Sequence, residues 1–205
     1  AAHEFCLGIV QKGRELTAYK RRMRYWTALA LLRAVMSSPA AAKAALEKRR
    51  RGRELEETPE EEWDLGAFAY EPTETPPPEE APWPLLERPE SGVPHEEPRL
   101  RRLLDLARAI TPEKDAKLQG CIRAVKNLLR EGFHPIVWCF YVATAECVAH
   151  ALEKALAQEF PEARVLCITG RLGEEERRAL VEDFMEEEGV QRVLVATECL
   201  SEGIN

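Results

Sequence analysis

Three short segments of the chain place hydroxyl, glycine and cationic residues where they could bind phosphate groups. The segments are 141–144, 169–171 and 197–205, and the candidate residues within them are Thr144, Gly170, Arg171 and Thr197. Hydroxyl, backbone amide and guanidinium groups donate hydrogen bonds, and phosphate oxygens accept them. The residues therefore predict a grip on the backbone phosphates of a nucleic acid, a contact that positions the strand without reading its sequence.

Each of these residues also has an ordinary structural explanation. Thr144 could cap the helix that follows it, and a threonine after a strand is more often a cap than a ligand. Gly170 and Gly203 could permit a positive φ, and Arg177 could be a plain charge on a helix surface. Taken singly, the segments leave both interpretations open.

Each segment directly follows a short apolar run that is typical of a buried strand. The runs are 135–141, 164–168 and 192–196, and the stretches 144–159 and 174–187 between them have helical periodicity. Strands joined by long helical crossovers pair in parallel with right-handed connections. We therefore expect helices on both faces of a parallel sheet, with the three segments at the carboxyl ends of its strands.

Helices are also predicted upstream of the first strand. Leu16 to Met36 reads as a long amphipathic helix, and Ser38 with Pro39 offers an N-cap and a first-turn proline for a second one running into Arg51. Two more apolar patterns, 100–107 and 118–129, predict helices before the sheet, the latter stopping near Gly132.

The net charge of −7 conceals three regions of different character. Residues 1–55 carry 13 Lys/Arg against 4 Asp/Glu, residues 56–98 carry 14 acids against one arginine, and residues 99–205 carry 15 against 18. This segregation predicts a basic helical region, an acidic linker and an α/β domain. The basic helices are either a solvated surface or a second phosphate-binding surface.

The acidic region 56–98 contains ten prolines, including three in a row at 76–78. Such a composition cannot bury enough apolar surface to offset the entropy of the chain. We expect a semi-extended linker or surface insertion with no helix longer than about two turns.

The sheet region, 115–205, resembles the second RecA-like lobe of superfamily 2 helicases and translocases. Trp138, Tyr141 and Thr144 are similar to the motif IV region of double-stranded DNA translocases related to chromatin remodellers. Asp115 with Lys117 is similar to the aspartate-x-lysine entry into this lobe in the same branch. The resemblance implies a partial RecA-like fold that belongs to a longer ATP-dependent enzyme.

The last part of the chain carries the most specific resemblance. Gly170, Arg177 and Phe184 follow one another at intervals of seven and resemble the segment before motif V, and 197–205 has the spacing of motif V itself. DEAD-box RNA helicases have arginine where this chain has Glu202, which favours DNA over RNA.

By this resemblance, the end of motif V faces a nucleotide bound between two lobes, and Glu202, Gly203 and Asn205 are the expected ATP-binding residues. Gly203 and Asn205 would lie near ATP, and Glu202 would lie at the interface with a first RecA-like lobe. The ligands of the Mg²⁺ that accompanies ATP would lie outside this chain. Because the loop 197–205 would touch both ligands, closure of the cleft on ATP would shift the grip on DNA.

The chain has no GxxxxGK[ST] phosphate-binding loop. The resemblance also implies that it stops before the arginine of motif VI, and the absence of an initiator methionine fits a segment of a longer protein. We therefore expect no catalytic residue and no metal ligand in this chain, and no ATPase activity from it alone.

Two other functions remain open: a non-enzymatic RecA-like interaction module, and a flavodoxin-like or other phosphate-binding α/β domain.

The six cysteines show no metal-ligand spacing, and several lie in apolar runs, which suits a reducing cytoplasm. With no apolar run long enough to cross a bilayer and no signal peptide, we expect a cytoplasmic protein without a membrane partner.

Overall fold

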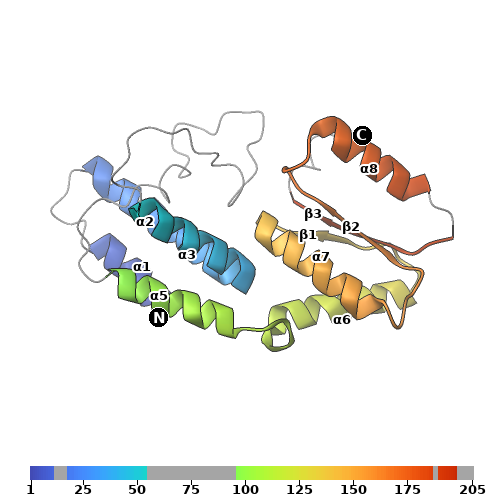
Figure 1. Cartoon of the computed structure of the whole chain (residues 1–205), viewed down its shortest axis with the longest axis horizontal. Helices are drawn as coiled ribbons and strands as arrows, with labels where there is room; N and C mark the ends of the chain where they lie inside the picture. The colour runs from blue at the N-terminus through green and yellow to red at the C-terminus, as the bar shows by residue number, and fades with distance from the viewer. Residues whose placement is uncertain (12–17, 55–95, 187–188, 198–205) are drawn as a thin grey trace. The chain divides into compact units, whose positions relative to one another are not determined.

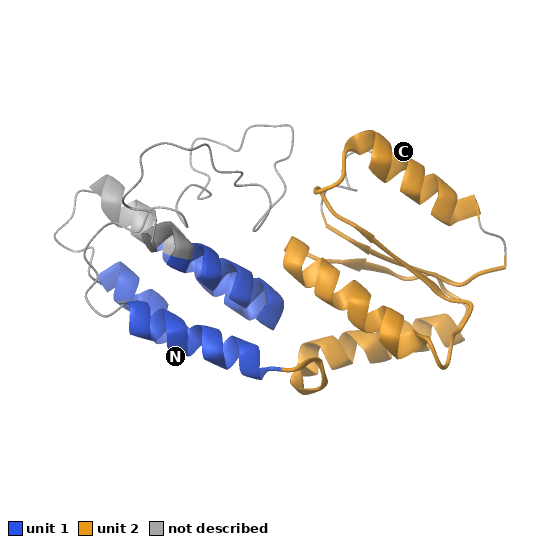
Figure 2. Cartoon of the chain, viewed as in Figure 1, with its two compact units in different colours: residues 1–110 blue, residues 111–205 orange. Residues whose placement is uncertain are grey.

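The chain divides into two compact units, residues 1–110 and 111–205 (Figure 2). The structure is a computed structural model that describes residues 1–11, 18–54, 96–186 and 189–197. None of the helices within these ranges is long and apolar enough to cross a membrane. The two units are described separately below.

The first unit is helical. It contains α1 (Ala2–Gln11), α2 (Ala18–Ser37), α3 (Pro39–Glu54) and α5 (Glu96–Ala109). α1 packs on α2, α2 on α3 and α3 on α5. Alanine and leucine supply most of its described core: Phe5, Cys6, Ile9, Ala28, Leu31, Ala34, Ala41, Ala42, Ala45, Leu46, Leu100, Leu103, Leu104 and Ala107.

The predicted helices around Ser38 are confirmed. The Ser38 hydroxyl accepts a hydrogen bond from the Ala41 amide at 3.0 Å, and Pro39 occupies the first helical position of α3. Pro39 is suited to this place because its missing amide hydrogen would have no partner in the helix. Helix α1 was not predicted, and a helix of this length is marginal in isolation, so packing on α2 stabilises it.

Helix α5 groups with the helical unit. It packs on α3, and Arg108 pairs with Glu47 at 3.0 Å. The sequence predicts a region of residues 99–205 that includes the sheet, and the two compact units of the structure divide after Ile110. The predicted acidic linker, 56–98, lies outside the described residues except for 96–98, which begin α5.

The second unit is α/β. After a short 3₁₀ turn, Pro112–Lys114, it contains α6 (Ala116–Arg130), β1 (Ile136–Trp138), α7 (Val142–Leu156), β2 (Arg164–Ile168), α8 (Glu174–Glu186) and β3 (Arg192–Ala196). The three strands form a parallel sheet in the order β1-β3-β2 (Figure 1). The prediction of a parallel sheet of three strands with flanking helices is confirmed.

Both ends of α6 are fixed by local hydrogen bonds. The Asp115 carboxylate accepts from the amides of Lys117 and Leu118, each at 3.0 Å. Gly132 ends the helix with φ of 84°, and Phe133 donates to the carbonyl of Leu128. These bonds satisfy amides and carbonyls that have no partner within the helix, and the positive φ explains the glycine.

Helices cover both faces of the sheet, as predicted. α6 and α7 lie on one face and α8 on the other (Figure 1). The larger core joins α6 and α7 to the sheet through Leu118, Val125, Leu129, Ala145, Val148, Ala149, Leu152, Leu156, Val193 and Val195. On the α8 face, Leu180 and Val181 pack against Ile168 and Ala196.

Strand β1 is less buried than its apolar sequence predicts. Val137 is half-buried, but Ile136 and Trp138 are 53% and 55% exposed. Both project to the α8 face, because they pair with Leu194 and Ala196, which belong to that face. The prediction of a buried strand is therefore wrong for these two residues. β1 is an outer strand of the sheet, and α8 covers the other two strands.

Candidate nucleic-acid interface

The three strands end level with one another at a single edge of the sheet. Ala196 of β3 is the register partner of both Trp138 of β1 and Ile168 of β2. Beyond this row, the Cys139 amide donates to the Ala196 carbonyl at 2.8 Å, and the Thr197 amide donates to the Ile168 carbonyl at 3.1 Å. The segments that follow the strands therefore leave the sheet from the same edge.

Thr144 lies in the first turn of α7. The helix begins at Val142, with Tyr141 at the N-cap position, and the Thr144 amide donates to the Tyr141 carbonyl at 2.9 Å. The interpretation of Thr144 as the helix cap is therefore wrong, because α7 begins two residues before it. The Thr144 side chain is half-buried in the first turn of α7.

Gly170 and Arg171 form the exposed tip of the loop between β2 and α8. The loop turns tightly, since the Leu172 amide donates to the Thr169 carbonyl at 3.2 Å. The described glycines with positive φ are Gly132 and Gly189, so a left-handed conformation does not account for Gly170.

Arg171 forms an ion pair with Glu146 of α7. Its Nη1 donates to the Glu146 carboxylate at 2.7 Å, and the two side chains are 44% and 46% exposed. Glu146 was not predicted from the sequence to be part of this site. The one sequence feature that could have indicated it is an acidic residue in the second turn of the helix after β1. The pair fixes the guanidinium at the carboxyl edge, where solvent reaches it.

Thr197 is placed differently from the other three residues. It follows β3 directly, but only 2% of its surface is exposed. In this arrangement its hydroxyl is not presented to solvent. The remaining predicted residues of this loop, Glu202, Gly203 and Asn205, lie outside the described residues.

Cys139 and Cys121, two of the cysteines that the structure describes, do not supply reactive thiols. Burial raises the pKa of the Cys139 thiol to about 11 and also raises the pKa of Cys121. Since the thiolate is the nucleophile and metal ligand, these thiols stay unreactive at neutral pH. Hydroxyl, amide and guanidinium groups remain, and they suit the binding of phosphate oxygens.

Comparison with known families bears on this unit alone. Residues 117–205 match the family described as the helicase conserved C-terminal domain. No curated protein and no solved structure matches the chain. The family match and the parallel sheet together support the assignment of this unit to the C-terminal, RecA-like lobe of a superfamily 2 helicase. The match covers none of the helical unit.

Proposed function

We propose that residues 111–205 supply the nucleic-acid-binding edge in the C-terminal lobe of an ATP-dependent DNA helicase or translocase. The observation that carries this proposal is the placement of Gly170 and Arg171. Both are exposed at the carboxyl edge of a parallel sheet, in the part of the chain that is similar to a helicase C-terminal domain. Ligands of open α/β sheets bind beyond this edge.

Each residue has a distinct role in the proposed contact. Arg171 donates to a backbone phosphate, and the Gly170 amide approaches it without obstruction from a side chain. Thr144 donates from the first turn of α7. Thr197 is buried, so its hydroxyl is not presented to a phosphate in this arrangement, and its contact with the strand stays a prediction. DNA is the preferred partner because Glu202 replaces the arginine of RNA helicases.

The Arg171–Glu146 ion pair leads to a specific expectation. Phosphate must compete with the Glu146 carboxylate for the guanidinium, and an exposed ion pair contributes only about 0.2–1 kcal/mol. Glu146→Gln should therefore strengthen binding by up to about fivefold at low salt. Fluorescence anisotropy with a labelled DNA duplex would measure it.

Glu153→Gln is the matched control for this experiment. Glu153 is an exposed acid on the same helix, and it lies near His150 rather than near Arg171. Its replacement removes the same charge and should change affinity less than Glu146→Gln does. Equal gains from both variants would show that net charge alone matters and would contradict a site at Arg171.

The nucleotide belongs to a site shared with a second lobe. We propose that Gly203 and Asn205 lie near ATP and that Glu202 lies at the interface with a first RecA-like lobe. Within the described residues, no group of three or more His, Cys, Asp or Glu could hold a metal ion. In this proposal, Mg²⁺ would depend on ligands outside these residues.

The chain alone should not hydrolyse ATP. It lacks a phosphate-binding loop, and arginines that contact the transferred phosphoryl group can contribute about 10³–10⁵ in rate in related hydrolases. A phosphate-release assay, with and without DNA, should give the background rate. Steady turnover that copurifies with the chain through successive columns would contradict the proposed division between two lobes.

A further inference from the structure

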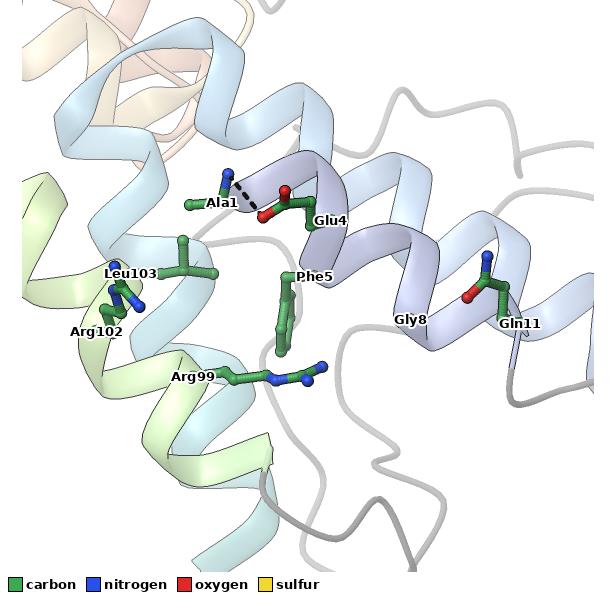
Figure 3. Close-up of a pocket in the computed structure, with 8 residues that line it drawn as sticks. All are labelled: Ala1, Glu4, Phe5, Gly8, Gln11, Arg99, Arg102 and Leu103. Carbon is green, nitrogen blue, oxygen red and sulfur yellow. Dashed lines mark ion pairs between the residues drawn. The ribbon is translucent and has the colours of Figure 1, made fainter.

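A cavity of about 480 Å³ lies between α1 and α5 in the helical unit (Figure 3). Phe5 and Leu103, which line it, are almost completely buried and give it an apolar floor. Arg99 and Arg102 also line it, and both are exposed. The volume lies in the range of about 300–1,000 Å³ that is usual for ligand pockets.

The two arginines of the cavity are available to a ligand. They lie three positions apart on α5 and therefore share one side of the helix. Arg101, which lies between them in sequence, is paired with Glu97 at 2.8 Å. Neither Arg99 nor Arg102 forms an ion pair with any other residue that the structure describes. The two guanidinium groups are therefore not paired with a carboxylate among the described residues.

Gly8 lets the Arg99 guanidinium lie against α1. A Cβ built at Gly8 would be 3.6 Å from Arg99 Nη1, which is ordinary van der Waals contact, and a longer side chain would enter the guanidinium's place. Figure 3 shows Arg99 extended beneath the Phe5 ring toward Gly8. A glycine inside a helix costs about 0.5–1 kcal/mol relative to alanine, and here it gives Arg99 room.

One acid also lines the cavity. It is Glu4, whose side chain is 83% exposed. The Gln11 amide lines the cavity as well, and the two guanidinium groups on α5 are its cationic side chains.

We infer that this cavity binds phosphodiester groups of a nucleic-acid backbone, as a second contact outside the helicase-like unit. The inference rests on the proposed function, because guanidinium groups bind phosphate and carboxylate alike. Because the α/β unit of the same chain is proposed to bind nucleic acid, phosphate is the ligand that we expect in this cavity. The apolar floor excludes water from one side and strengthens the electrostatic attraction.

The test compares binding of a labelled DNA duplex by the whole chain and its variants at about 50 and 200 mM salt. Arg99→Gln combined with Arg102→Gln should weaken binding about tenfold at low salt. It should also reduce the slope of log affinity against log salt by up to about two, which corresponds to the loss of two phosphate contacts. Arg101→Gln, a control on the same helix that removes a single positive charge, should change affinity less than twofold. Gly8→Leu should weaken binding without any change in charge.

Each outcome decides between the two proposals. Equal losses of affinity for Arg101→Gln and the double variant, or no loss for either, would contradict phosphate binding in the cavity. If Arg171→Glu weakens binding while the double variant does not, the proposed function is supported and binding in the cavity is contradicted. If the double variant weakens binding while Arg171→Glu does not, binding in the cavity is supported and binding at the carboxyl edge of the sheet is contradicted. Polyglutamate that displaces the duplex as well as unlabelled DNA does would overturn the phosphate assignment.

Discussion

Leu152→Ala is expected to lower the free energy of unfolding of the sheet-bearing unit by about 2–5 kcal/mol. Leu152 lies on α7, is 0% exposed, and belongs to the cluster that joins this helix to Val193 and Val195 of β3. Truncation would leave a cavity in the middle of that cluster, and domains are stable by only about 5–15 kcal/mol. The loss is thus a large part of the total.

Hydrogen exchange at the Val193 and Val195 amides would measure this loss in the correct unit. The control is Leu128→Ala on α6, where the side chain is 38% exposed. It removes the same atoms from a site that solvent already reaches, so the expected loss is smaller. Equal losses from the two substitutions would contradict the packing of α7 on the sheet.

Arg171→Glu is expected to weaken DNA binding by about tenfold or more at low salt. The change removes a charge-assisted hydrogen bond, which contributes about 1.5–3 kcal/mol, and adds a negative charge beside Glu146. Loss of one phosphate contact should also reduce the slope of log affinity against log salt by about one. Anisotropy titrations across a range of salt would measure both quantities.

Arg178→Glu provides the comparison for this prediction. Arg178 is an exposed residue of α8, whose first residue follows the loop that carries Arg171. Its reversal makes the same change in net charge, so any larger loss with Arg171→Glu reflects position. If the two variants bind DNA equally well, Arg171 is not part of the interface.

The sheet could be predicted from the sequence because its signals are local. The runs at 164–168 and 192–196 coincide with β2 and β3, and the long crossovers determine parallel pairing. The order β1-β3-β2 depends on which strands pair, which no local pattern encodes. For the same reason, the exposure of Trp138 on an edge strand could not be predicted from an apolar run.

The placement of the candidate site was predictable, but the state of its side chains was not. Residues after parallel strands must leave from one edge, so Thr144, Gly170 and Thr197 follow from topology. The burial of Thr197 and the pairing of Arg171 with Glu146 depend on contacts between segments distant in sequence. Helix α1 of the helical unit could not be predicted for the same reason, because it depends on packing against α2.

The most direct test of a nucleic-acid interface at the carboxyl edge is an NMR titration of the isotopically labelled chain with a short DNA duplex. Within residues 111–205, the largest shifts should occur at the amides of Thr144, Gly170 and Arg171. Largest shifts at the opposite edge, where His134 accepts from the Arg192 amide and β2 begins at Arg164, would contradict the account, as would the absence of any shift in this unit.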